Sequence, residues 1–127
     1  MRGSFGSFLA RQCVEKDVKL TELSSITGKS VSYLSDVKKG RRLPPNGPFL
    51  EQITSVFSMT TTEVDEMYDC SGNDRGIVSE DMTDYIMSEE LPAIRAAIRI
   101  ARDRHLTNDF WLEIAKLIIK EGKPHAM

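Results

Sequence analysis

Residues 20–44 decide the fold, and they read LTELSSITGKSVSYLSDVKKGRRLP. Apolar side chains recur there at three-residue steps in two groups: Leu20, Leu23 and Ile26, then Val31, Leu34 and Val37. Gly28 follows the first group, and glycine ends short helices because it adopts the left-handed backbone conformation without strain. Ser30 is a good N-cap for the second group, which Gly40 ends. The stretch therefore predicts two short helices joined by a tight turn at residues 27–30.

The flanking segments predict three further helices. Each segment carries apolar residues at helical spacing: Phe5, Phe8, Leu9 and Cys13; Phe49, Leu50, Ile53, Val56 and Phe57; Val64, Met67 and Tyr68. The run RRLPPNGP at 41–48 is expected to be extended, because proline disfavours helix in the residue before it. Helices this short are unstable alone, so their apolar stripes must pack together in one core.

The second half of the chain predicts a linker and more helices. The stretch CSGNDRG at 70–76 mixes Gly, Asn and Asp without an apolar repeat, which indicates a linker. We therefore expect a five-helix domain over residues 1–72, a linker at 73–78 and a helical C-terminal region over 79–122. No alternating strand pattern occurs, so the predicted fold class is all-α.

Charge is divided unevenly along the 127 residues, although the net charge is only −2. Residues 1–46 hold nine Lys/Arg and four Asp/Glu, residues 47–90 hold one and eleven, and residues 91–127 hold seven and four. A basic block beside an acidic one suits a protein that presents a positive face to phosphates while staying soluble. The acidic block is equally consistent with a solvated surface.

Several function classes are disfavoured by the residues present. The apolar runs are far too short to span a membrane and the N-terminal sequence lacks a signal-peptide pattern, so we expect a cytoplasmic protein. Cys13 and Cys70 have no metal-type spacing, so we expect reduced structural thiols, no metal and no cofactor. The two histidines, His105 and His125, lack the neighbours of a catalytic set. We expect no enzymatic activity.

Residues 20–44 resemble the phage-repressor-like (Xre, or Cro-repressor) family of helix-turn-helix transcription regulators. Four features carry the resemblance: the small residue Ser24, the turn at Gly28, SYLSD at 32–36 and the exit GRRLP at 40–44. Segments 5–9 and 48–53 are similar to the family's first and fourth helices, so the resemblance covers roughly residues 3–72. It implies a five-helix phage-repressor-like DNA-binding domain, followed here by a small helical C-terminal extension.

The resemblance implies that the helix after Ser30 lies in the major groove of double-stranded DNA. Base contacts are expected from Val31, Ser32, Tyr33 and Asp36, and phosphate contacts from Lys29, Lys38, Lys39, Arg41 and Arg42. The chemistry fits, because valine packs on a thymine methyl, a serine hydroxyl donates or accepts, and a carboxylate accepts from cytosine N4. Val31 and Tyr33 have an alternative role, which is packing in the core or at the helix end.

Four positions depart from the family pattern. Cys13 stands where the family commonly has Arg, and Lys38 where its partner Glu sits, so both halves of an ion pair are absent together. Lys19 replaces the usual Ser or Thr before the second helix, and Gln12 replaces an apolar residue in the first. These last changes weaken the expectation of a side-chain cap and a phosphate contact at the start of the second helix.

The sequence thus predicts a sequence-specific transcription regulator, a repressor of a phage or mobile-element promoter. One helix-turn-helix reads few base pairs, so a homodimer on two half-sites is expected. Its contacts are expected at Phe110, Trp111, Ile114 and Ile118, because these residues cover more than one face of the last helix. The alternative is an antitoxin or inhibitor that binds a protein partner through the C-terminal helices and regulates its own gene through the helix-turn-helix.

Overall fold

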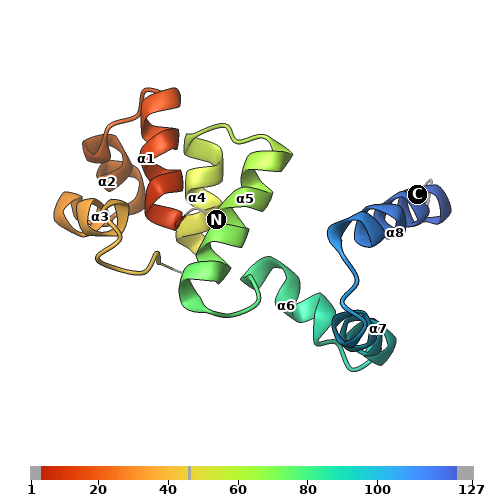
Figure 1. The fold of residues 1–127 in the computed structure, drawn as a ribbon. Helices are drawn as coiled ribbons and strands as arrows, with labels where there is room; N and C mark the ends of the chain where they lie inside the picture. Colours follow the sequence, from red (N-terminus) through yellow and green to blue (C-terminus); the bar gives the residue numbers. More distant parts are fainter. Residues whose placement is uncertain (1–3, 46, 123–127) are drawn as a thin grey trace. The chain divides into compact units, whose positions relative to one another are not determined.

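The computed structural model describes residues 4–45 and 47–122, and within them it contains eight α-helices and no strand (Figure 1). The helices are α1 (Phe5–Glu15), α2 (Leu20–Thr27), α3 (Val31–Lys38), α4 (Pro48–Val56), α5 (Thr61–Arg75), α6 (Glu80–Ile86), α7 (Pro92–Asp103) and α8 (Asn108–Glu121). The predicted all-α fold class is confirmed. The chain divides into two compact units, Met1–Thr83 and Asp84–Met127.

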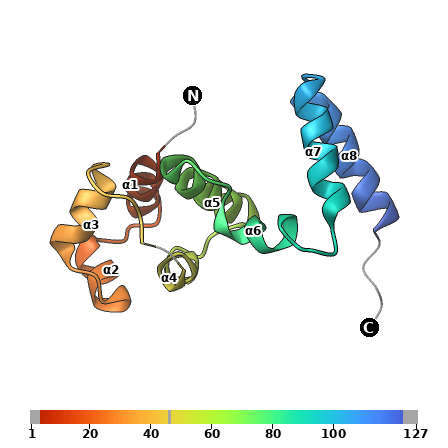
Figure 2. The same ribbon diagram turned by 90° about the horizontal axis from the view of Figure 1, so that it is seen from below.

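One hydrophobic core holds the first unit together. α1 packs against α3 and α5, and α2 packs against α3 and α4 (Figure 2). The buried side chains of the core are Phe5, Phe8, Leu9, Leu23, Leu34, Val37, Phe49, Leu50, Ile53, Phe57, Met67 and Cys70. Burying one such apolar side chain stabilises the fold by about 1.5–3 kcal/mol. This shared core explains how α2 and α3, at eight residues each, persist as helices.

The apolar stripe predicted for α2 is only partly buried. Leu23 is buried, whereas Leu20 is half-buried and Ile26 is exposed. An α-helix turns by about 100° per residue, so positions 20 and 26 lie roughly 120° apart around the helix axis. Three-residue spacing therefore does not keep all three side chains on one buried face.

The ends of α2 and α3 have local causes. Gly28 has a φ of 78°, the left-handed conformation expected of it. The Ser30 hydroxyl accepts a hydrogen bond from the Tyr33 N–H at 3.0 Å and so caps α3. At the start of α2, the Lys19 side chain cannot cap the helix, because an ammonium group donates hydrogen bonds but cannot accept one from a backbone N–H. Instead the Glu22 carboxylate accepts from the Lys19 N–H at 3.2 Å, which satisfies one free donor there.

Gly6 brings α1 directly onto the C-terminal end of α3. A β-carbon at position 6 would lie 2.6 Å from the carbonyl oxygen of Lys38 and 2.7 Å from that of Val37. Both atoms belong to the backbone, so a larger residue would push the two helices apart. The close approach fixes the position of the end of α3. The basic segment, residues 39–42, begins directly after it.

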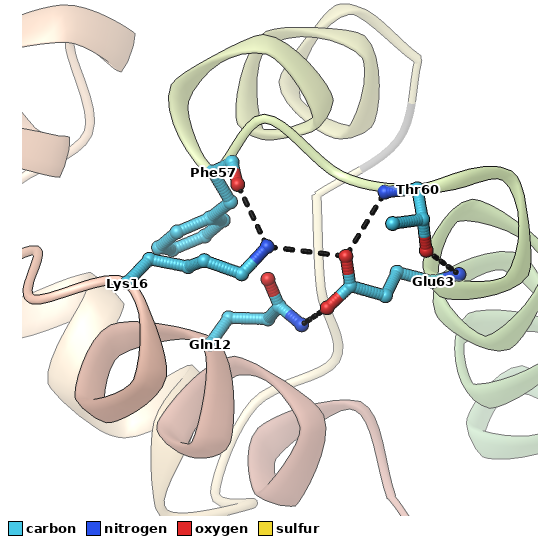
Figure 3. Close-up of polar contacts among 5 residues, drawn as sticks. All are labelled: Gln12, Lys16, Phe57, Thr60 and Glu63. Carbon is cyan, nitrogen blue, oxygen red and sulfur yellow. Dashed lines mark hydrogen bonds and ion pairs between the residues drawn. The ribbon is translucent and has the colours of Figure 1, made fainter.

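A polar network joins α1 to the end of α4 and the start of α5 (Figure 3). The buried Gln12 donates to one Glu63 oxygen at 2.9 Å. Lys16 donates to the other Glu63 oxygen at 3.1 Å and to the Phe57 carbonyl at 2.9 Å. Thr60 and Glu63 also bond reciprocally as a capping box that begins α5. The network satisfies the amide nitrogen of the buried Gln12, whereas its amide oxygen has no hydrogen-bond partner among the described residues.

We expect Glu63→Gln to destabilise the protein near neutral pH and to have little effect in acid. The hydrogen bonds from Gln12, Thr60 and Lys16 lower the pKa of Glu63 from 4.5 to about 2. The folded state therefore binds this proton less readily than the unfolded chain does. Its stabilising contribution is present above the ordinary pKa of 4.5 and is lost as the pH falls toward about 2. Urea unfolding followed by circular dichroism at several pH values measures the difference.

The matched control for this prediction is Glu66→Gln, one turn further along α5. Glu66 pairs with Arg11, and the two side chains are 41% and 48% exposed, so solvent screens the pair and it is expected to contribute little. A Glu63→Gln effect of equal size near neutral pH and near pH 3 would contradict the role assigned to the carboxylate.

The predicted linker at 73–78 is corrected by the structure. α5 continues to Arg75, and Gly76, with a φ of 69°, ends it. Residues 70–72 are buried, and a β-carbon at Gly72 would lie 3.0 Å from the backbone of Ser79. Tertiary packing thus keeps a Gly- and Asn-containing stretch helical, although its composition favours a loop.

The end of α5 also anchors two distant segments of the first unit. The contacts are the Phe5 N–H to an Asp74 carboxylate oxygen at 2.9 Å, the Arg75 guanidinium to the Pro44 carbonyl, and the Gly47 N–H to a Glu80 carboxylate oxygen at 3.1 Å. They tie the start of α1 and the segment after α3 to α5 and α6. The first unit accordingly extends to Thr83, beyond the boundary at residue 72 that the composition predicted.

The second unit leaves most of its apolar side chains exposed. Within its described residues, 84–122, Ala101 is the only hydrophobic residue that is buried. The helices α7 and α8 do not pack along one another. Arg95 donates to the carbonyls of Ile86 at 2.7 Å and Ser88 at 2.8 Å, which ties the end of α6 to α7. Among the residues that the structure describes, no helix has the length and apolar composition needed to cross a bilayer.

Candidate nucleic-acid interface

α3 exposes its N-terminal half and buries its opposite side. Leu34 and Val37 lie in the core, while Ser32 is exposed and Val31 is 41% exposed. The alternative of Val31 as a core residue is therefore wrong. Ser32 and Asp36 are four residues apart, so they lie on the same face of the helix. An exposed helix face with short side chains is able to enter the major groove, which is about 12 Å wide.

Cationic side chains lie at both ends of α3. Lys29 precedes the helix, Lys38 is its last residue, and Lys39, Arg41 and Arg42 follow it, all of them exposed. Within the described residues, none of the three lysines takes part in an ion pair. The structure therefore brings the five predicted phosphate-contacting residues to the ends of one helix.

The basic residues of α1, by contrast, are neutralised within the fold. Arg11 pairs with Glu66, and Lys16 pairs with Glu63 at 3.1 Å. The acidic block that precedes residue 90 thus offsets positive charge on α1. Lys29, Lys38 and Lys39, at the two ends of α3, take part in no ion pair within the described residues, and neither do Lys19 and Arg75 elsewhere in the first unit.

Two of the predicted base-contacting side chains contact the basic segment. The Asp36 carboxylate lies 3.8 Å from the Arg41 guanidinium and 3.9 Å from that of Arg42. Arg42 also lies over the Tyr33 ring, 5.4 Å from its centroid, at cation–π distance. Tyr33 is half-buried and packs against the core, which agrees with the alternative considered for it. These contacts were not predicted from the sequence, because they depend on the chain turning back after α3.

The predicted self-association residues lie on α8, and none of them is fully buried. Phe110 and Trp111 form an edge-to-face pair with ring centroids 5.2 Å apart. Ile114 is half-buried and Ile118 is exposed. Ile119, which was not among the predicted contacts, is 75% exposed. The helix therefore presents apolar side chains on more than one face, including a face not identified from sequence.

The thiols lie in surroundings that disfavour the reactive thiolate. Burial raises the pKa of Cys13 above its ordinary value, and nearby Lys38 opposes the shift in part. Burial, followed by the charge of Glu66, raises the pKa of Cys70. Thiols of this kind are poor nucleophiles at neutral pH. Residues 4–45 and 47–122 hold no group of three potential metal ligands. His105 is at the end of α7, and His125 lies outside the described residues.

The chain was compared with protein-family models, curated proteins and solved structures, and none of them matches it. The residues of the chain and their geometry are therefore the features that bear on its function. The strongest of these features is the exposed α3 with cationic side chains at both of its ends.

Proposed function

We propose that this chain is a sequence-specific double-stranded DNA-binding transcription regulator of the phage-repressor-like helix-turn-helix kind. One observation carries the proposal. The face of α3 with Leu34 and Val37 is buried in the core, whereas Val31 and Ser32 are exposed, with cationic residues at both ends of the helix. A helix presented in this way reads base edges, and cations at its ends hold the flanking phosphates. The regulated DNA is a phage or mobile-element promoter, where the protein acts as a repressor.

In this proposal the two parts of the interface have different tasks. Val31 and Ser32 contact base edges and supply sequence preference. The cationic side chains contact phosphates, which supplies affinity and orientation but no sequence information. They are Lys29, Lys38, Lys39, Arg41 and Arg42. The exposed end of α3 therefore sets which DNA is chosen, and the basic residues set how strongly any DNA is held.

The proposed protein binds DNA as a homodimer formed by the second unit. Exposed apolar side chains on α7 and α8 support this, because isolated helices do not hold such surface open to water without a partner. Residues 84–122 hold six Lys/Arg and seven Asp/Glu, so two copies do not repel one another. A strongly acidic or basic partner would require an excess of the opposite charge on this unit. The near balance of charges therefore favours a second copy of the chain as the occupant.

The same exposed apolar surface supports the second candidate function, an antitoxin or inhibitor that binds a different protein. In that case the helix-turn-helix serves to regulate its own gene. The two candidates differ in the state of the isolated chain. The first expects a dimer of the pure protein, whereas the second expects a monomer that associates only when its partner is present.

A direct test measures binding to duplex DNA. The purified chain is titrated at low salt into labelled DNA from upstream of its own gene and into random-sequence duplex. We expect binding to both, with the upstream site retained as salt is raised and protected in a footprint. Absence of binding to either duplex at low salt would rule out the proposed function.

A further inference from the structure

Asp36 is the centre of a small charged cluster at the end of α3. Its carboxylate faces the guanidinium groups of Arg41 and Arg42 at 3.8 and 3.9 Å, and its carbonyl accepts from the Arg41 N–H at 2.8 Å. Gly40, with a φ of 78°, turns the chain back toward α3 just before these arginines. The arginines are thereby held over the helix face that the proposed function assigns to DNA.

The contacts of Asp36 are close but exchangeable. At 3.8 and 3.9 Å they are ion contacts and not short hydrogen bonds. The side chains of Arg41 and Arg42 are 69% and 61% exposed, so a phosphate is able to reach both. Exposed ion pairs of this kind contribute little to stability, so another anion is able to displace the carboxylate. The Tyr33 ring, under Arg42, positions that arginine while the exchange takes place.

We propose that Asp36 competes with DNA phosphates for Arg41 and Arg42, and thereby lowers the affinity of this protein for non-specific DNA. The inference rests on the proposed function and adds a determinant of its specificity. On random duplex, phosphates must displace the Asp36 carboxylate from the two arginines. The carboxylate then stays close to the phosphates without a cationic partner, which is unfavourable. At the correct site, the released carboxylate accepts a hydrogen bond from a cytosine amino group, which offsets the loss. Discrimination arises from the repulsive contribution at wrong sites.

The test compares Asp36→Asn with a charge-matched control, Asp65→Asn. Asparagine keeps the shape of the side chain and removes only its charge, and thermal unfolding monitors whether the fold is retained. Asp65 is exposed on α5 and takes part in no ion pair within the described residues. Fluorescence anisotropy with a random-sequence duplex is run at physiological salt, where the Debye length is about 8 Å and distant charges are screened.

We expect Asp36→Asn to tighten binding to random duplex by about two- to fivefold, the size of one exposed ion pair, and Asp65→Asn to change it much less. On a site selected from a random pool, Asp36→Asn gains less or loses affinity, so the ratio of specific to non-specific binding falls. In a protein that also carries Arg41→Ala and Arg42→Ala, the gain from Asp36→Asn disappears, because the two arginines for which Asp36 and the phosphates compete are absent.

Three outcomes would overturn the inference. Asp36→Asn tightens random-duplex binding no more than Asp65→Asn does, or its gain persists without Arg41 and Arg42, or it only weakens binding at the selected site. The last outcome would mark Asp36 as a plain base contact and would leave the proposed function intact. If the unaltered chain binds no duplex, the proposed function and the inference fall together, so the two kinds of failure are distinguishable.

Discussion

Replacing Arg41 and Arg42 together by alanine is expected to weaken binding to every duplex while leaving the preferred sequence unchanged. Both side chains are exposed and follow α3 directly, so their loss removes phosphate contacts and the counterion release that accompanies them. Each phosphate contact contributes about 0.9 to the slope of log K against log salt concentration, so the slope should flatten by about 1.8. Anisotropy titrations across a salt series measure affinity and slope together.

The control for this double variant removes the same charge from the second unit. Arg99 and Lys120 are exposed on α7 and α8 and take part in no ion pair within the described residues. Arg99→Ala with Lys120→Ala should leave the salt slope unchanged, since net charge alone is not the cause. A slope that flattens equally in both variants, or a changed sequence preference after loss of Arg41 and Arg42, would contradict the phosphate role.

Trp111→Glu is expected to convert a dimer into a monomer and to remove most affinity for a palindromic site. Trp111 is 36% exposed and lies edge-on to Phe110, so a carboxylate there places charge in the apolar surface that would face the second copy. Linking two half-site readers raises affinity by about 10²–10⁴, and a monomer loses that gain. Light scattering across micromolar concentrations gives the mass, and anisotropy on a palindromic duplex gives the affinity.

The first unit should still fold in the Trp111→Glu protein, because its core uses no side chain of α7 or α8. Val14→Glu is the matched control, since Val14 is an exposed apolar residue on α1, and this variant should remain a dimer. A monomeric mass for the unaltered chain would refute the homodimer. It would favour the antitoxin or inhibitor candidate, in which a different protein covers α8.

Structural elements that depend only on neighbouring residues were predictable from the amino-acid sequence. The turn at Gly28 and the cap at Ser30 need only backbone and side chains within a few positions, so composition is enough to predict them. The buried side of α3, at Leu34 and Val37, follows from helical periodicity in the same way. The position of the basic residues at the two ends of α3 was also predictable from their order in the chain.

Features that join remote segments of the chain became visible only in the folded structure. α5 runs through the predicted linker because Gly72 packs against residues 77–79 and because Asp74 bonds Phe5, 69 positions away. Gln12 is buried because Glu63, 51 positions later, accepts its hydrogen bond. Such contacts require two segments to meet in space, and periodicity within one helix carries no information about where another segment lies.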